Sequence, residues 1–179
     1  MAHHMKALIL LAILITAGCS PSTTPGETTL SLGGEEWTLE LAVTPEEIQT
    51  GLMHRNSIAP GTGMIFIFPD SRVHSFWMAY CLTDIDLMYV DGTGRITATH
   101  TMKVEPPRGE AETERTYLDR MPGYSSVFPA RVAIELPAGS IRRLGLEAGD
   151  PTGLDMRAIE DLRSRVATDR WRAGSREQP

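Results

Sequence analysis

A run of five apolar residues, Met64 to Phe68, is the feature that most constrains how this chain can fold. A half-buried strand alternates apolar and polar side chains, whereas a short run that is apolar at every position is typical of a strand covered on both faces. A buried helical segment of the same length would show the same pattern. We favour the strand, which requires packed material on both of its sides.

Two other segments show the alternation of a half-buried strand. Trp37, Leu39, Leu41 and Val43 alternate with more polar residues, and the segment 131–136 places Val132, Ile134 and Leu136 on one side. Further strands are expected at 74–79, 85–90 and 95–101. The turn sequence Asp91-Gly92-Thr93-Gly94 predicts a hairpin between the last two.

One short helix is signalled by Thr44-Pro45-Glu46-Glu47, because Thr44 suits the cap, Pro45 the first position and Glu47 the capping box. A loop is expected at 56–63, and Pro69 to Ser71 are expected to end the strand that follows it. We expect a mobile loop with little regular structure at 105–124 and one helical turn at 140–144. The predicted fold is α+β and mainly antiparallel, with a barrel-like or sandwich sheet.

The segment 151–179 differs in composition from the rest of the chain. Ile159, Leu162 and Val166 are spaced as on one face of a helix, and five arginines crowd the other positions between 155 and 172. We interpret this segment as an arginine-rich, amphipathic and partly disordered tail. Two readings stay open, a solvated helix and a helix that docks to a partner or an anionic surface.

The N-terminal segment predicts export. Lys6 precedes an apolar run of 11 residues, too short to span a bilayer, and the run ends in small residues before Cys19. Residues 1–18 are therefore interpreted as a signal peptide, and the segment 15–20 resembles a bacterial lipobox that would attach lipid to Cys19. Ordinary secretion with cleavage nearby is the alternative. Residues 19–28 would form a flexible tether, and Ser20 favours the periplasmic face of the outer membrane if the cell is Gram-negative.

Charge and cysteine content narrow the partners and the chemistry. The net charge of the 179 residues is −6, which makes nucleic acid a poor partner. With Cys19 acylated, Cys81 is the only thiol left, so no intramolecular disulfide is available and the fold depends on its core.

Several ordered sequence words carry a family resemblance. They are Gly51-Leu52-Met53-His54-Arg55, Gly63-Met64-Ile65-Phe66-Ile67-Phe68, Phe76-Trp77-Met78, Asp91-Gly92-Thr93-Gly94-Arg95-Ile96 and Glu135-Leu136-Pro137-Ala138-Gly139. Together they resemble the bacterial and archaeal family called domain of unknown function 192, over a domain that we place at 29–150. The resemblance implies a small, mainly β domain, often exported, and brings no established activity. The chain departs from the family at Ala79-Tyr80-Cys81, at Asp84 and in the charged insertion 108–122.

The candidate ligand-binding residues are Trp77, Arg55, Tyr124 and Glu135, because an aromatic surface with a few polar groups is the usual setting for a small ligand. The function favoured is a non-enzymatic envelope module that binds a small molecule or assists an envelope protein. A hydrolase of envelope or carbohydrate material is the alternative, with Asp86, Glu135 and His74 as acid or base candidates. Handling of copper or another divalent metal comes third. The histidines, methionines and Cys81 are ligand types that suit copper, but they are not spaced as in a metal-binding motif. We expect no cofactor and no metal site.

Overall fold

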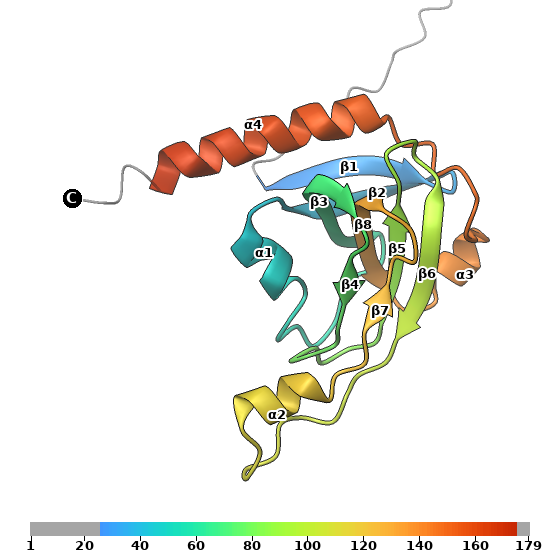
Figure 1. The fold of residues 1–179 in the computed structure, drawn as a ribbon. Coiled ribbons are helices and arrows are strands. Elements are labelled where there is room, and N and C mark those ends of the chain that lie inside the picture. Colours follow the sequence, from blue (N-terminus) through green and yellow to red (C-terminus); the bar gives the residue numbers. More distant parts are fainter. Residues whose placement is uncertain (1–25, 175–179) are drawn as a thin grey trace, which may run out of the picture.

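The computed structural model describes residues 26–174, and a six-stranded sheet forms its centre (Figure 1). In spatial order the strands are β1 (Glu27–Leu32), β2 (Glu35–Ala42), β3 (Thr62–Arg72), β8 (Ala130–Pro137), β5 (Ile85–Val90) and β6 (Ile96–Met102). Only β2 and β3 pair in parallel, and the other neighbouring strands are antiparallel. The sheet is open, and the predicted α+β, mainly antiparallel class is confirmed. The predicted signal peptide and Cys19 lie outside the described residues.

β3 is covered on both faces, as its apolar run predicts. Every residue from Gly63 to Phe68 is buried. The expectation that Pro69 to Ser71 end this strand is wrong, because β3 continues to Arg72. The pairing of β3 with β8 is irregular between Ile67 and Arg72, and a proline is tolerated at such an irregularity because its missing N–H is not needed there.

The first face of the sheet packs against α3 (Ser140–Leu144) and α4 (Met156–Gly174). Ile141, Ile159 and Leu162 are buried with the alternating side chains of β2 and β8 in one core cluster. Arg131 of β8 pairs with Glu160 of α4, and Figure 1 shows α4 lying across the sheet beside β1. The predicted helix of the C-terminal segment is confirmed, and apolar side chains between Met156 and Ala167 pack on the domain's own core.

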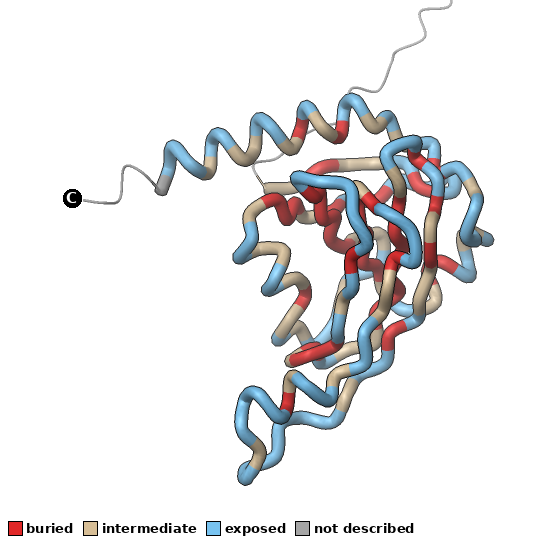
Figure 2. Tube along the Cα trace, in the orientation of Figure 1, coloured by how far each residue is buried: buried red, intermediate tan, exposed pale blue. Residues whose placement is uncertain are grey.

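The second face packs against α1 (Pro45–Thr50) and a two-stranded ribbon formed by β4 (Ser75–Phe76) and β7 (Tyr124–Ser125). Figure 2 shows the buried residues concentrated between these layers. The predicted strand at 74–79 is wrong beyond Phe76. After Phe76 the chain turns inward, with Met78 and Ala79 buried and Tyr80 at a φ of 58°.

α1 begins as the sequence predicts. The Thr44 side chain accepts a hydrogen bond from the Glu47 N–H, and the Glu47 carboxylate accepts one from the Thr44 N–H. Both contacts satisfy N–H groups that a helix N-terminus leaves without partners. Glu47 also pairs with Arg170 of α4, so α1 and α4 are joined at this end.

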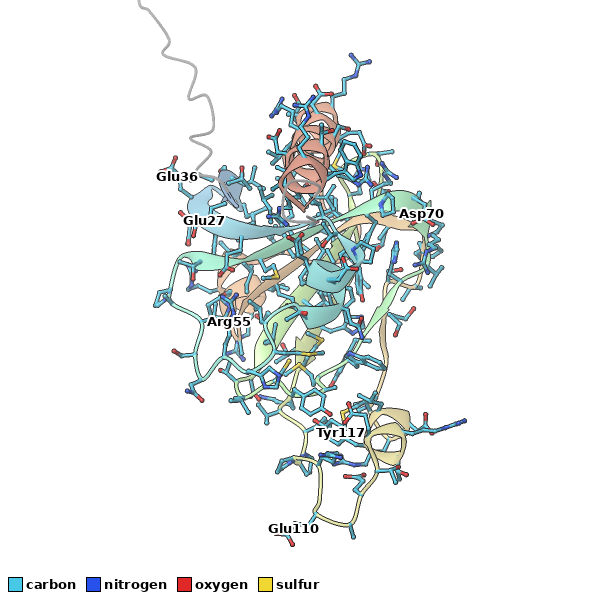
Figure 3. The ribbon with its side chains drawn as sticks, turned by 90° about the vertical axis from the view of Figure 1, so that its left-hand side faces the viewer. Glu27, Glu36, Arg55, Asp70, Glu110 and Tyr117 are labelled. Carbon is cyan, nitrogen blue, oxygen red and sulfur yellow. The ribbon has the colours of Figure 1, made fainter. Side chains whose placement is uncertain are left out.

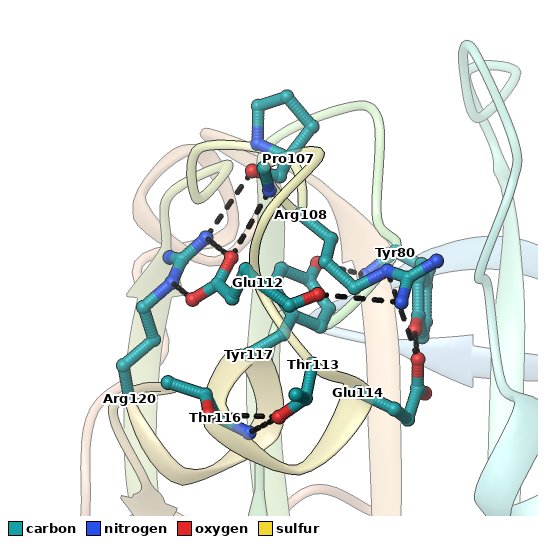
Figure 4. A network of polar contacts seen from close by, with 10 residues as sticks. Tyr80, Pro107, Arg108, Glu112, Thr113, Glu114, Thr116, Tyr117 and Arg120 are labelled. Carbon is teal, nitrogen blue, oxygen red and sulfur yellow. Dashed lines mark hydrogen bonds and ion pairs between the residues drawn. The ribbon is translucent and has the colours of Figure 1, made fainter.

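The predicted mobile loop at 105–124 is wrong in part, because it contains α2 (Glu114–Asp119), capped by Thr113. Figure 4 shows the polar contacts around this helix: Arg120 binds Glu112 and the carbonyl of Pro107, and Glu114 accepts from Tyr80. The hydroxyl of the buried Tyr117 accepts a hydrogen bond from the Tyr80 N–H at 2.9 Å. The charged side chains of this segment, which suggested a mobile loop, therefore make the contacts that hold α2 in place.

Candidate functional site

A hollow of about 230 Å³ lies between α1, the second face of the sheet and β4. We call it the Glu135 hollow. Aromatic rings and a few polar side chains make up most of its wall. The lining residues that matter here are Gly51, Phe66, Phe68, Arg72, His74, Phe76, Trp77, Cys81 and Glu135.

Strand register places Glu135 at the inner wall of this hollow. Glu135 of β8 lies opposite Met64 of β3 on one side and Leu87 of β5 on the other, and both neighbours are buried. Side chains directly across a sheet share a face, so this carboxyl projects among apolar groups. Glu135 is only 4% exposed, and its Oε2 atom has no hydrogen-bond partner within the protein.

Burial raises the pKa of Glu135 from 4.5 to about 8, and the Arg55 guanidinium opposes this rise only in part. A carboxyl taken out of water favours its protonated form unless an opposite charge compensates it. Arg55 already donates to Glu40 from both terminal guanidinium nitrogens, with Nη2 at 2.8 Å from Glu40 Oε2. At neutral pH the hollow therefore contains a mostly protonated acid with an unused oxygen.

Gly51 lets the chain approach this carboxyl closely. It follows α1 at φ 47° and ψ −131°, a conformation that is open to glycine and strained for other residues. A Cβ atom there would lie 3.3 Å from Phe66 and 3.5 Å from Glu135 Oε2. A side chain at this position would therefore occupy the hollow itself.

Four aromatic side chains form the apolar wall. Phe76 meets Phe66 edge to face, with ring centroids 4.8 Å apart, and Phe68 stacks on the His74 ring at 3.6 Å. Trp77 lines the same hollow and is 40% exposed, so it lies where the hollow reaches solvent. The rings hold one another in place, which favours a preformed site.

His74 and Cys81 are the other buried groups that can exchange protons here. Burial lowers the pKa of His74, and the Arg72 guanidinium adds to this effect, so the ring is neutral at pH 7. His74 Nε2 has no partner within the protein. Burial also raises the pKa of the Cys81 thiol to about 12, with Glu135 contributing, which makes Cys81 a poor nucleophile.

The structure brings together two of the four predicted ligand-binding residues, Trp77 and Glu135. Arg55 lines a neighbouring hollow of about 550 Å³ that also includes Thr50 and Gly51. Figure 3 shows Arg55 on one side of α1 and Asp70 on the other. Tyr124 lies on β7 opposite Phe76, where its carbonyl accepts from the Tyr89 hydroxyl, and it does not line the Glu135 hollow.

Of the three acid or base candidates, His74 and Glu135 line one hollow and Asp86 does not. Asp86 is 1% exposed and accepts hydrogen bonds from the Thr101 hydroxyl at 2.8 Å and the Ile141 N–H at 2.9 Å. The second contact satisfies an N–H in the first turn of α3. Asp86 therefore joins β5, β6 and α3 as a structural group.

Sequence reasoning missed Gly51, Phe66 and Phe68 as parts of the site. Phe66 and Phe68 were assigned only to a buried strand, although their spacing places both on one face. Gly51 follows the capped helix where a glycine commonly ends helices. The sequence therefore shows Gly51 as an ordinary end of a helix, and nothing in the pattern distinguishes it as a glycine that leaves room for a ligand.

Within residues 26–174, no group of three or more histidine, cysteine, aspartate or glutamate side chains is arranged to hold a metal ion. No helix in that range is both long and apolar enough to cross a membrane.

The sequence comparison gives one family. Residues 28–153 match the family of domain of unknown function 192, described as an uncharacterised ACR. The chain belongs to this family. The resemblance carried by the ordered sequence words is thus confirmed, and the match includes α1, the ribbon and Glu135. No curated protein matches the chain.

Two solved structures are similar to this member of the domain of unknown function 192 family. One is a candidate transcription regulator from Sinorhizobium meliloti 1021, with 32% identity, a TM-score of 0.52, and coverage of 65% of this chain and 81% of that one. The other is a protein of unknown function from Novosphingobium aromaticivorans DSM 12444, with 22% identity, a TM-score of 0.57, and coverage of 76% and 94%. The second likeness concerns the fold alone.

Proposed function

We propose that this protein is a non-enzymatic binding module that takes a small molecule into the Glu135 hollow. One observation carries the proposal: an enclosed carboxyl with an unpartnered oxygen faces a cavity walled by aromatic rings. An unpartnered buried polar atom is costly to the folded protein, and a ligand that bonds to it removes that cost. Few, convergent polar groups in an aromatic cavity are the usual design of a small-molecule site.

The cell envelope is the proposed place of action. The support is in the sequence, where an apolar run of 11 residues ends before Cys19 in a lipobox-like segment. A lipid anchor at Cys19 and a short tether would hold the domain near the membrane surface, where it would meet a small molecule or an envelope protein.

A thermal-shift screen of small organic molecules tests the binding function. We expect ligands that raise the melting temperature of the wild-type protein and lose most of that effect in Trp77→Ala. Trp171→Ala is the matched control, because Trp171 is 72% exposed on α4, and it should respond like the wild type. Stabilisation that is equally lost in both variants, or that survives in both, would place binding elsewhere.

A hydrolase is the second candidate, because Glu135 and His74 share one hollow and both have shifted pKa values. Glu135 would be the general acid and His74 the general base. The structural position of Asp86 leaves the site without the third group proposed from sequence. Turnover of carbohydrate or ester substrates that disappears in both Glu135→Gln and His74→Gln would favour this candidate over binding alone.

A further inference from the structure

The wall of the Glu135 hollow combines an unpartnered carboxyl oxygen with aromatic rings, and this combination indicates the class of ligand. We propose that the hollow binds a small organic cation whose ammonium group contacts Glu135 and whose carbon body lies against Phe66, Phe68, Phe76 and Trp77. This inference rests on the proposed binding function and specifies its ligand.

An ammonium group matches both parts of the wall. Glu135 Oε2 is enclosed without a partner, and an N–H donor with a positive charge makes a stronger bond to a carboxylate than a neutral donor does. The faces of aromatic rings also attract cations, most strongly when water is excluded. A cavity of about 150 Å³ is known to hold benzene, so the 230 Å³ here has room for a ring or short chain with one ammonium group.

The charged and titratable groups around Glu135 do not already neutralise its carboxylate. Arg55, from the chain after α1, is the cation whose charge lowers the pKa of the Glu135 carboxyl, and it is bonded to Glu40. Cys81, which lines the hollow, and Tyr89 of β5 both sense the charge of Glu135, and burial keeps both protonated and neutral. His74 is also neutral at pH 7.

Arg72 is the one lining group that opposes a cation. It lies more than half exposed and pairs with Asp70 at 3.2 Å, so solvent and its partner screen its charge. Glu135 is enclosed, and its interaction with a bound charge is screened much less. The enclosed carboxyl therefore dominates the selection of the ligand's charge.

The protonation of Glu135 gives this inference a pH signature. A cation binds the ionised carboxyl, so at a pH below about 8 binding must release a proton. Affinity is then expected to rise about tenfold per pH unit well below 8 and to level off above it. A neutral hydrogen-bond acceptor or an anion would instead prefer the protonated acid and lose affinity as the pH rises.

Three probes of similar shape test the charge preference: benzylammonium, benzyl alcohol and benzoate, titrated calorimetrically into the full chain at pH 6, 7 and 8. We expect benzylammonium to bind most tightly, with affinity about tenfold higher at pH 7 than at pH 6 and proton release detected by comparing two buffers. Glu135→Gln should lose most of this affinity and the pH dependence. Glu46→Gln, which removes an exposed carboxyl from α1, should keep both.

Two results would overturn the inference in different ways. Tighter binding of benzyl alcohol or benzoate, lost in Trp77→Ala, would reject the cation while the binding function stands. Failure of all three probes to bind would reject the cation, and the thermal-shift screen would then decide the binding function separately.

Discussion

The carboxyl of Glu135 affects stability as well as binding, because its pKa differs between the folded and unfolded chain. Below about pH 4.5 it is protonated in both states and has no effect. As the pH rises from 4.5 to about 8, the unfolded chain loses this proton first, so folding becomes progressively less favourable. The full difference corresponds to roughly 5 kcal/mol at most.

Replacing Glu135 by glutamine should therefore stabilise the protein at high pH. The amide has nearly the same shape and cannot ionise, so at pH 5 the variant and the wild type should unfold at similar urea concentrations. At pH 8.5 most of that difference applies, so the variant should be more stable by roughly 4 kcal/mol. Glu46→Gln, at an exposed position, should follow the wild type at both pH values. A wild-type disadvantage that does not grow with pH would contradict the account of Glu135.

Cys81 should be inert in the folded protein. Burial raises its pKa to about 12, so the thiolate fraction at pH 8 is on the order of 10⁻⁴. Alkylation by iodoacetamide, followed by mass mapping of the Cys81 peptide, should be at least ~100-fold slower in the native protein than in urea. Rapid native alkylation would contradict this prediction and indicate an activated thiol.

At the scale of elements, α4 contributes to the core that holds the sheet, although its composition is that of a solvated helix. Ile159 and Leu162 are buried, and the Arg170 guanidinium donates to the Leu41 carbonyl of β2 at 3.2 Å. Through Glu47, the same arginine contacts α1, which lines the Glu135 hollow. α4 therefore supports the wall of the candidate site from the other side.

Leu162→Ala should destabilise the protein by about 2–4 kcal/mol in urea unfolding, because the change leaves a cavity between α4 and the sheet. Arg165→Ala, on the exposed side of the same helix, should change stability by less than ~0.5 kcal/mol. Equal and small effects of both substitutions would mean that α4 is not part of the folding unit.

The elements that the sequence predicted are those whose local pattern and tertiary role agree. The alternation in β8 marks a strand with one large apolar face, and Thr44 and Glu47 cap α1 by local contacts alone. α2 was missed because Glu112, Tyr80 and Arg120 order it through contacts that no local pattern shows. β4 is short because its length depends on β7, a partner distant in sequence.

The same division holds for the candidate site. Trp77 and Glu135 were predicted from residue type and the words around them, and both line one hollow. Arg55 lies in the neighbouring hollow, where its guanidinium is bonded to Glu40 of β2. The spacing of these two residues in the sequence did not reveal that pairing. Whether any of these residues binds a ligand stays a prediction.

At the scale of the whole molecule, we propose that a lipid anchor at Cys19 holds the domain near a membrane surface. Cys19 lies outside the described residues, and its acylation is predicted from the segment 15–20 alone. Wild-type protein expressed with a palmitate analogue should carry the label and fractionate with membranes. Cys19→Ala should lose both properties, while Cys81→Ala, at the buried thiol, should keep them. Label that persists in Cys19→Ala would contradict lipidation.

The central claim is that the Glu135 hollow receives a small molecule, and chemical-shift mapping with a stabilising ligand tests it most directly. With ¹³C-labelled methyl groups and glutamate carboxyls, the account predicts concentration-dependent shifts at Glu135, Ile48 and Met53, all of which line the hollow. Methyl signals of Ile159 and Leu162, on the opposite side of the sheet, should stay in place. Shifts confined to that opposite side, with Glu135 unchanged, would contradict the account.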